Sequence, residues 1–105
     1  MLLRDVLPFF ATELEELLRA DGHHALARAC PDLEVAEPCG CGDDFCGGFY
    51  TGPRPNGPWG SGHVNVVLRP KVGMVILDVV DGQIRFVEVL YRKDVRDRVD
   101  RLFAN

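Results

Sequence analysis

The sequence predicts an α+β fold, with an antiparallel sheet of four to five strands, helices before it and one helix after it. Apolar residues recur at helical spacing in the first 30 residues and again in the last dozen. Between these segments, short alternating stretches of apolar and polar residues are separated by glycine, proline and aspartate, as in strands joined by turns. Helices and strands that are segregated along the chain are typical of α+β domains.

Two helices are expected before the sheet and one after it. The first covers about 5–20 and ends at Gly22, and a shorter one covers His23–Ala29, turns Cys30 inward and ends at Pro31. The third covers about 94–103, with Asp94 as its N-cap. Each of these segments places its larger apolar side chains on one face, so each should bury that face.

Five segments alternate as strands do. They are 33–37, 45–51, 63–69, 74–80 and 83–91. The last two flank Asp81-Gly82, a strong signal for a two-residue hairpin turn, and such a turn pairs Asp78 with Arg85. With this register one face of the hairpin carries Val75, Leu77, Val79, Ile84, Phe86 and Leu90. Ile76, Val87 and Val89 make the other face apolar too, so we expect a central hairpin that is covered on both sides.

Length and composition indicate one globular domain. The 105 residues match the commonest domain size and contain no repeat or linker, so residues 1–105 should form a single domain. A hydrophobic fraction of 47% is that of a folded protein rather than a disordered one. The net charge of −4 and the presence of only two lysines argue against a nucleic-acid binder, because phosphate contacts need clustered basic side chains.

No targeting or membrane segment is recognisable. No apolar run is long enough to cross a bilayer, and the N-terminal apolar stretch carries Asp5 and Glu13 where a signal peptide would be uninterrupted. We therefore expect a cytoplasmic protein. Cysteines in that compartment stay reduced, and they serve as metal ligands or catalysts more often than as disulfides.

The stretch PCGCGDDFCGGFYT, residues 38–51, is the candidate functional site. Its three cysteines, Cys39, Cys41 and Cys46, have the spacing C-x-C-x4-C, and thiolates suit zinc, which takes four ligands in a tetrahedron. His63 is the preferred fourth ligand because it follows Cys46 at a loop length common in zinc fingers. Cys30 is the alternative fourth ligand, although a role as a small core residue explains it more economically. The carboxylates of Asp43 and Asp44, or a water molecule, are the remaining choices.

Other kinds of chemistry compete for the same cysteines. A thiol enzyme or redox sensor would use Cys39 and Cys41, and copper(I) handling would use all three thiols. The thiols could also simply be reduced cysteines in a glycine-rich turn. A zinc nucleobase deaminase would need His-x-Glu before Pro-Cys-x-x-Cys, and Pro38-Cys39-Gly40-Cys41 is one residue too short. No phosphate-binding loop or serine nucleophile elbow is present.

Several segments together resemble a family of small uncharacterised bacterial proteins. They are CGDDFC followed by FYT, then WGSGH, and then GMVILDVVDG, within residues 39–90. The resemblance implies no activity. It supports treating Cys41, Cys46 and His63 as parts of one module.

These observations favour a non-enzymatic, zinc-stabilised interaction module with a structural Cys3His site. The loop 52–62 contains three prolines and presents Arg54 and Trp59, which makes it a candidate surface for an unidentified protein partner. Alternatively, Trp59 folds over the metal site or the sheet. We expect a monomer or a homodimer that binds neither nucleic acid nor membranes.

Overall fold

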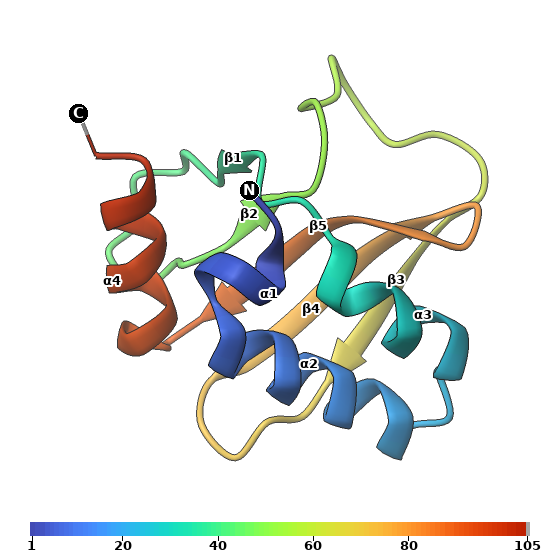
Figure 1. Cartoon of the computed structure of the whole chain (residues 1–105). Helices are drawn as coiled ribbons and strands as arrows, with labels where there is room; N and C mark the ends of the chain where they lie inside the picture. The colour runs from blue at the N-terminus through green and yellow to red at the C-terminus, as the bar shows by residue number, and fades with distance from the viewer. Residues whose placement is uncertain (105) are drawn as a thin grey trace.

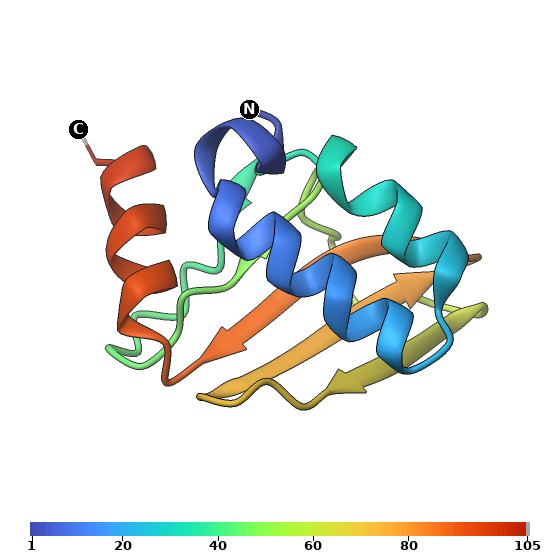
Figure 2. The same ribbon diagram turned by 60° about the horizontal axis from the view of Figure 1, so that its bottom comes forward.

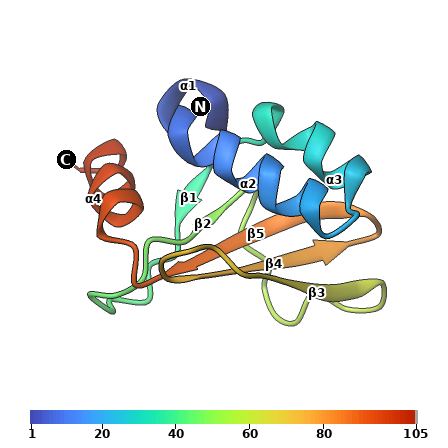
Figure 3. The same ribbon diagram turned by 90° about the horizontal axis from the view of Figure 1, so that it is seen from below.

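Three helices cover one face of a five-stranded antiparallel sheet (Figures 2 and 3). The computed structural model describes residues 1–104. Strands lie in the order β1-β2-β5-β4-β3. Their bounds are β1 (Glu37–Pro38), β2 (Phe49–Tyr50), β3 (His63–Leu68), β4 (Met74–Val80) and β5 (Gln83–Leu90). The predicted α+β class is confirmed, and the β4–β5 hairpin is central to the sheet as expected.

The helices are α1 (Leu3–Val6), α2 (Pro8–Ala20), α3 (His24–Ala29) and α4 (Lys93–Leu102). The single helix predicted over 5–20 is divided at Leu7, because Pro8 has no N–H to continue the hydrogen-bond ladder and instead occupies the first position of α2. Figure 1 shows α4 beside the 38–48 loop, away from the other helices. Within residues 1–104, no helix is both long enough and apolar enough to cross a membrane.

The hydrophobic core lies between α2 and the helix-facing side of the sheet. Phe10, Leu14 and Leu18 recur at helical spacing along α2 and are fully buried. Opposite them, β4 and β5 contribute buried valines and leucines, of which Leu77 and Val87 are direct cross-strand partners. Burying side chains of this size contributes about 1.5–3 kcal/mol each. This packing keeps the helices on one face of the sheet.

The β4–β5 hairpin departs from the predicted register at one point. Asp81 and Gly82 both have positive φ, 51° and 80°, as the predicted two-residue turn requires. A β-bulge between Asp78 and Val79 then pairs Asp78 with Phe86 rather than with Arg85. The extra residue moves every later β5 side chain to the opposite face. Val87 and Val89 therefore face the helices, in place of the predicted Phe86 and Leu90.

Phe86 lies on the other face of the sheet, under aromatic side chains rather than helices. Its ring centroid is 4.4 Å from that of Tyr50, and the Trp59 ring lies 6.4 Å from Tyr50. Over residues 1–104 no helix covers this side (Figure 3). The expected cover on both faces is therefore only partly present. Helices cover one side, whereas on the other side Trp59 of the 52–62 loop lies near Tyr50, and Val67 and Met74 are exposed.

The first two predicted strands are much shorter than expected. Residues 33–35 pair with the N-terminus instead of the sheet, since Val35 N donates to Met1 O and Leu3 N to Leu33 O, both at 2.7 Å. Within 45–51 only Phe49–Tyr50 forms a strand, and Cys46 makes an isolated bridge to Leu90. This leaves most of the cysteine-containing segment as a loop at the end of β5.

Candidate metal centre

Three thiols converge in the 38–48 loop. The Sγ atoms of Cys39, Cys41 and Cys46 all lie within 4.8 Å of one another, and none is in a disulfide. Sulfurs that bind one tetrahedral zinc at about 2.3 Å are about 3.8 Å apart. Small side-chain rotations would therefore bring these three sulfurs onto one ion, so the donor set fits a thiophilic metal.

Glycines make the close approach of the first two thiols feasible. Gly40 and Gly42 have φ values of +75° and +80°, a conformation that glycine adopts without strain. They alternate with Cys39 and Cys41, so the backbone turns back after each of these cysteines. The Cys39 N–H also donates to Gly48 O at 3.0 Å, which closes the base of the loop.

The loop is held against β5 and α4 by close backbone contacts. Gly47 N donates to Val89 O at 2.8 Å, which ties the loop to the strand. A Cβ on Gly47 would lie 2.9 Å from the Cα and N of Arg96, so only glycine allows the loop to touch α4 here. The three thiols are thus positioned by two elements that are far from them in sequence.

Burial favours the protonated form of the Cys39 and Cys46 thiols in the absence of a cation. Burial raises the pKa of Cys46 to about 12, with a further contribution from the neighbouring thiols. Burial also raises the pKa of Cys39. A bound cation would reverse this balance, because metal binding displaces the thiol protons.

The structure does not bring His63 to the thiols, contrary to the expected Cys3His set. His63 pairs with Val80 at the turn end of the hairpin, whereas Cys46 bridges Leu90 at the other end. The intervening length of β4 is about 20 Å at ordinary strand rise. His63 Nε2 instead lies 2.6 Å from Asp78 Oδ1. The 52–62 loop has to carry the chain past the β4–β5 hairpin, and this displaces His63 from the site.

The alternative fourth ligand, Cys30, is also distant from the thiol group. It lies fully buried in the helix layer, and its Sγ donates to Leu26 O at 3.3 Å. Desolvation raises its pKa to about 12. In residues 1–104 the only group of three or more close potential ligands consists of Cys39, Cys41 and Cys46. Cys30 is therefore a core residue.

A cleft of about 530 Å³ opens beside the thiols and has α4 as its other wall. The loop side carries Asp43 and Asp44, the alternative ligands that the sequence offers. The α4 side carries Asp100 with the apolar Val99 and Phe103. Sequence reasoning missed the contribution of α4, because no local pattern links the cysteines to a helix that begins 47 residues after Cys46.

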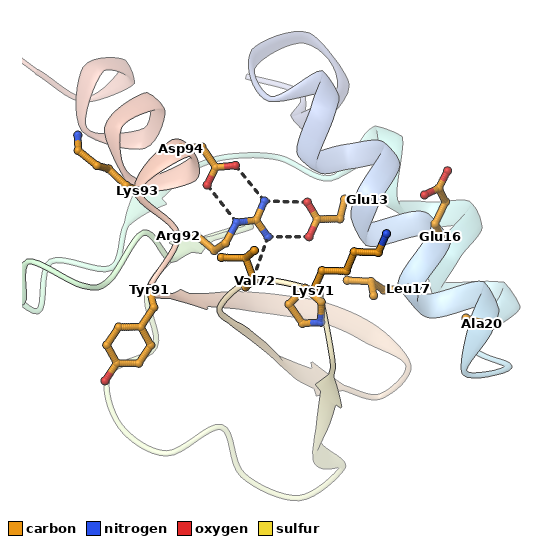
Figure 4. Close-up of a pocket in the computed structure, with 11 residues that line it drawn as sticks. Glu13, Glu16, Leu17, Ala20, Lys71, Val72, Tyr91, Arg92, Lys93 and Asp94 are labelled. Atoms are coloured by element: carbon orange, nitrogen blue, oxygen red, sulfur yellow. Dashed lines mark hydrogen bonds and ion pairs between the residues drawn. The ribbon is translucent and has the colours of Figure 1, made fainter.

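A larger concavity of about 690 Å³ lies between α2, the 70–72 segment and the start of α4 (Figure 4). Arg92 is at its base, and all five of its N–H groups donate, to Glu13, Asp94 and the carbonyl of Val72. A guanidinium with no spare donor cannot bind an anionic ligand strongly. This arrangement is a structural connection between elements rather than a ligand site.

No protein-family model, curated protein or solved structure matches this chain. The chemistry of the donor set and its surroundings therefore carries the functional argument.

Proposed function

We propose that the chain is a zinc-stabilised, non-enzymatic interaction module. The observation that carries the proposal is the convergence of the Cys39, Cys41 and Cys46 thiols within 4.8 Å of one another. Three sulfur donors select soft or borderline cations over magnesium or calcium. Zinc is the ion that proteins most often bind through thiolates at structural sites, and copper(I) is the competing assignment.

The ion would stabilise the fold locally. Ordering of the 38–48 loop depends on a few backbone hydrogen bonds and on glycine contacts, because Phe45 is the one large apolar side chain of the loop and it is exposed. In small zinc domains, binding free energy of the metal is folding free energy. Zinc at this loop would hold it against β5 and α4.

A structural ion would also fix an exposed aromatic pair next to it. The rings of Phe45 and Tyr91 stack with centroids 5.3 Å apart, and 38% and 61% of these residues are exposed. Tyr91 N donates to Phe45 O at 2.9 Å, so the loop positions both rings. Exposed aromatic side chains are typical of protein-binding surfaces. In this proposal the loop presents them to an unidentified protein partner in the cytoplasm, from a monomer or a homodimer.

The thiol enzyme or redox sensor is less well supported. A reactive cysteine needs a lowered pKa, whereas burial raises the pKa of Cys39 and Cys46. Cys41 is exposed but lies within the same group of thiols.

The experiment is elemental analysis of protein that was purified without added metal or chelator. We expect about one zinc per chain. Cys39→Ser, Cys41→Ser and Cys46→Ser should each lose most of the zinc, while the matched control Cys30→Ala should retain it. A fully folded wild-type protein without any metal would contradict the proposal, and copper in place of zinc would favour the competing assignment.

A further inference from the structure

We propose that Asp100 of α4 supplies the fourth ligand to the ion, an inference that rests on the proposed function. The three thiols come from one loop and approach the ion from one side. Tetrahedral zinc at a structural site needs a fourth donor on the remaining side. That side faces the cleft whose other wall is α4, and Asp100 is the carboxylate that α4 contributes to this wall.

Asp100 is held loosely enough to move to the ion. Its Oδ2 lies 3.6 Å from the Nε of Arg96, beyond hydrogen-bond distance, and 66% of its side chain is exposed. Asp100 does not belong to the group of mutually close ligand atoms, so binding requires its side chain to rotate into the cleft. An exposed aspartate with one weak ion pair can make that rotation at little cost.

The two aspartates of the loop are less suitable. Asp43 and Asp44 lie in a turn between Cys41 and Cys46, and Cys46 N donates to Asp43 O at 3.4 Å. A carboxylate from this turn would have to point back over the thiols and complete a four-ligand set within eight residues. Asp100 instead approaches from the opposite wall.

The surroundings of Asp100 also suit a negatively charged complex. Zinc with three thiolates and one carboxylate carries a net charge of −2. Arg96 lines the same cleft one helical turn before Asp100 and is half-buried. Its guanidinium can therefore offset part of this charge. An ion bound by the three thiols and by Asp100 would link α4 directly to the cysteine loop.

The test compares Asp100→Asn with the matched loop variants Asp43→Asn and Asp44→Asn. Zinc affinity is measured on the full chain by competition with a colorimetric chelator. We expect Asp100→Asn to lower the affinity by at least about 10- to 100-fold, the loss that removal of a group merely supporting a metal ligand causes. Each loop variant should change it by less than about fivefold, the effect of an exposed charge. Circular dichroism would verify that every variant is folded.

Amide hydrogen exchange with and without zinc gives a second readout. Removal of the Asp100 charge would not alter it unless Asp100 binds the ion. Zinc should slow exchange of the amides of both the loop and α4 in the wild type, but only those of the loop in Asp100→Asn. Unchanged affinity in Asp100→Asn, or a larger loss in either loop variant, would overturn the inference. If Asp100→Asn had no effect but the three cysteine variants still lost their zinc, the inference about Asp100 would fail and the proposed function would stand. Retention of zinc by the cysteine variants would refute both.

Discussion

Arg92 and Glu13 are joined by two hydrogen bonds across 79 positions of sequence. The two guanidinium Nη atoms donate to the Glu13 carboxylate oxygens at 2.6 and 2.8 Å (Figure 4). The remaining donors of Arg92 bind Asp94 and the carbonyl of Val72. Hydrogen bonds that Arg92 donates to Glu13 and then to Asp94 raise the pKa of Arg92, so the guanidinium stays charged. One side chain thus links α2, the β3–β4 loop and the start of α4.

Removing one partner of this ion pair should destabilise the fold. Glu13→Gln keeps the shape of the side chain but removes its charge and one acceptor, which leaves the buried guanidinium partly uncompensated. We expect a loss of about 1–3 kcal/mol in the free energy of unfolding, measured by urea denaturation. Glu16→Gln, at an exposed site on the same helix, is the control and should change it by less than about 0.5 kcal/mol. Equal effects would show that the ion pair contributes nothing.

Acid should weaken the same connection through Asp94. Hydrogen bonds from Arg92 hold the pKa of Asp94 below its ordinary value. A carboxyl group whose pKa is lowered by folding stabilises the folded state above its unfolded pKa, and this stabilisation is lost as the pH falls through the folded pKa. The stability advantage of the wild type over Asp94→Asn should therefore be present at neutral pH and be lost as the pH falls below about 4. Because Asp94 is half exposed, the advantage should not exceed about 1 kcal/mol.

This role of Asp94 also differs from the N-cap that the sequence predicts. Asp94 lies inside α4, the residue before the helix is Arg92, and no side chain caps the first turn. The carboxylate bonds the guanidinium instead. Local sequence rules evaluate each helix end in isolation. They carry no information about a charged partner fixed in place by Glu13 on a distant helix.

Most of the fold follows from local patterns, because the spacing of apolar residues and the Asp81-Gly82 turn are enough to define the helices and the central hairpin. The bulge between Asp78 and Val79 is the main exception. Both faces of β5 are apolar, so the pattern of Phe86, Val87 and Val89 fits either register. Only packing against the helices on one side and Tyr50 on the other selects between them.

Local sequence patterns predict one part of the candidate site, and the other part depends on long-range packing. The spacing of the three cysteines and the glycines between them predicts a compact thiol group, and the structure has one. The sequence predicts His63 as the fourth ligand from its loop length after Cys46 and its position at the start of a strand. Loop length says nothing about direction, and the strand order places β3 on the far side of the hairpin from β2.

Gly47 provides a test of the contact between the loop and α4. In Gly47→Ala the new methyl group would lie 2.9 Å from the backbone of Arg96, so the loop or the helix must move. We expect a loss of about 1–3 kcal/mol in the free energy of unfolding together with weaker zinc binding. Gly57→Ala is the matched control, because a Cβ there meets nothing within 4 Å. If both variants unfold at the same urea concentration and bind zinc equally, the contact has no energetic importance.

His63→Ala should leave zinc binding intact, since the structure places the imidazole at the opposite end of the β4–β5 hairpin from Cys46. Its effect should be on β3 instead. The variant loses the 2.6 Å contact with Asp78, which keeps a hydrogen bond from Asn65 at 2.7 Å. We expect a loss of about 0.5–1.5 kcal/mol in the free energy of unfolding. Zinc content and urea midpoint, measured on one preparation, separate the two effects. A variant that is folded but free of zinc would show that His63 reaches the thiols after all, and that the loop length from Cys46 was the better guide.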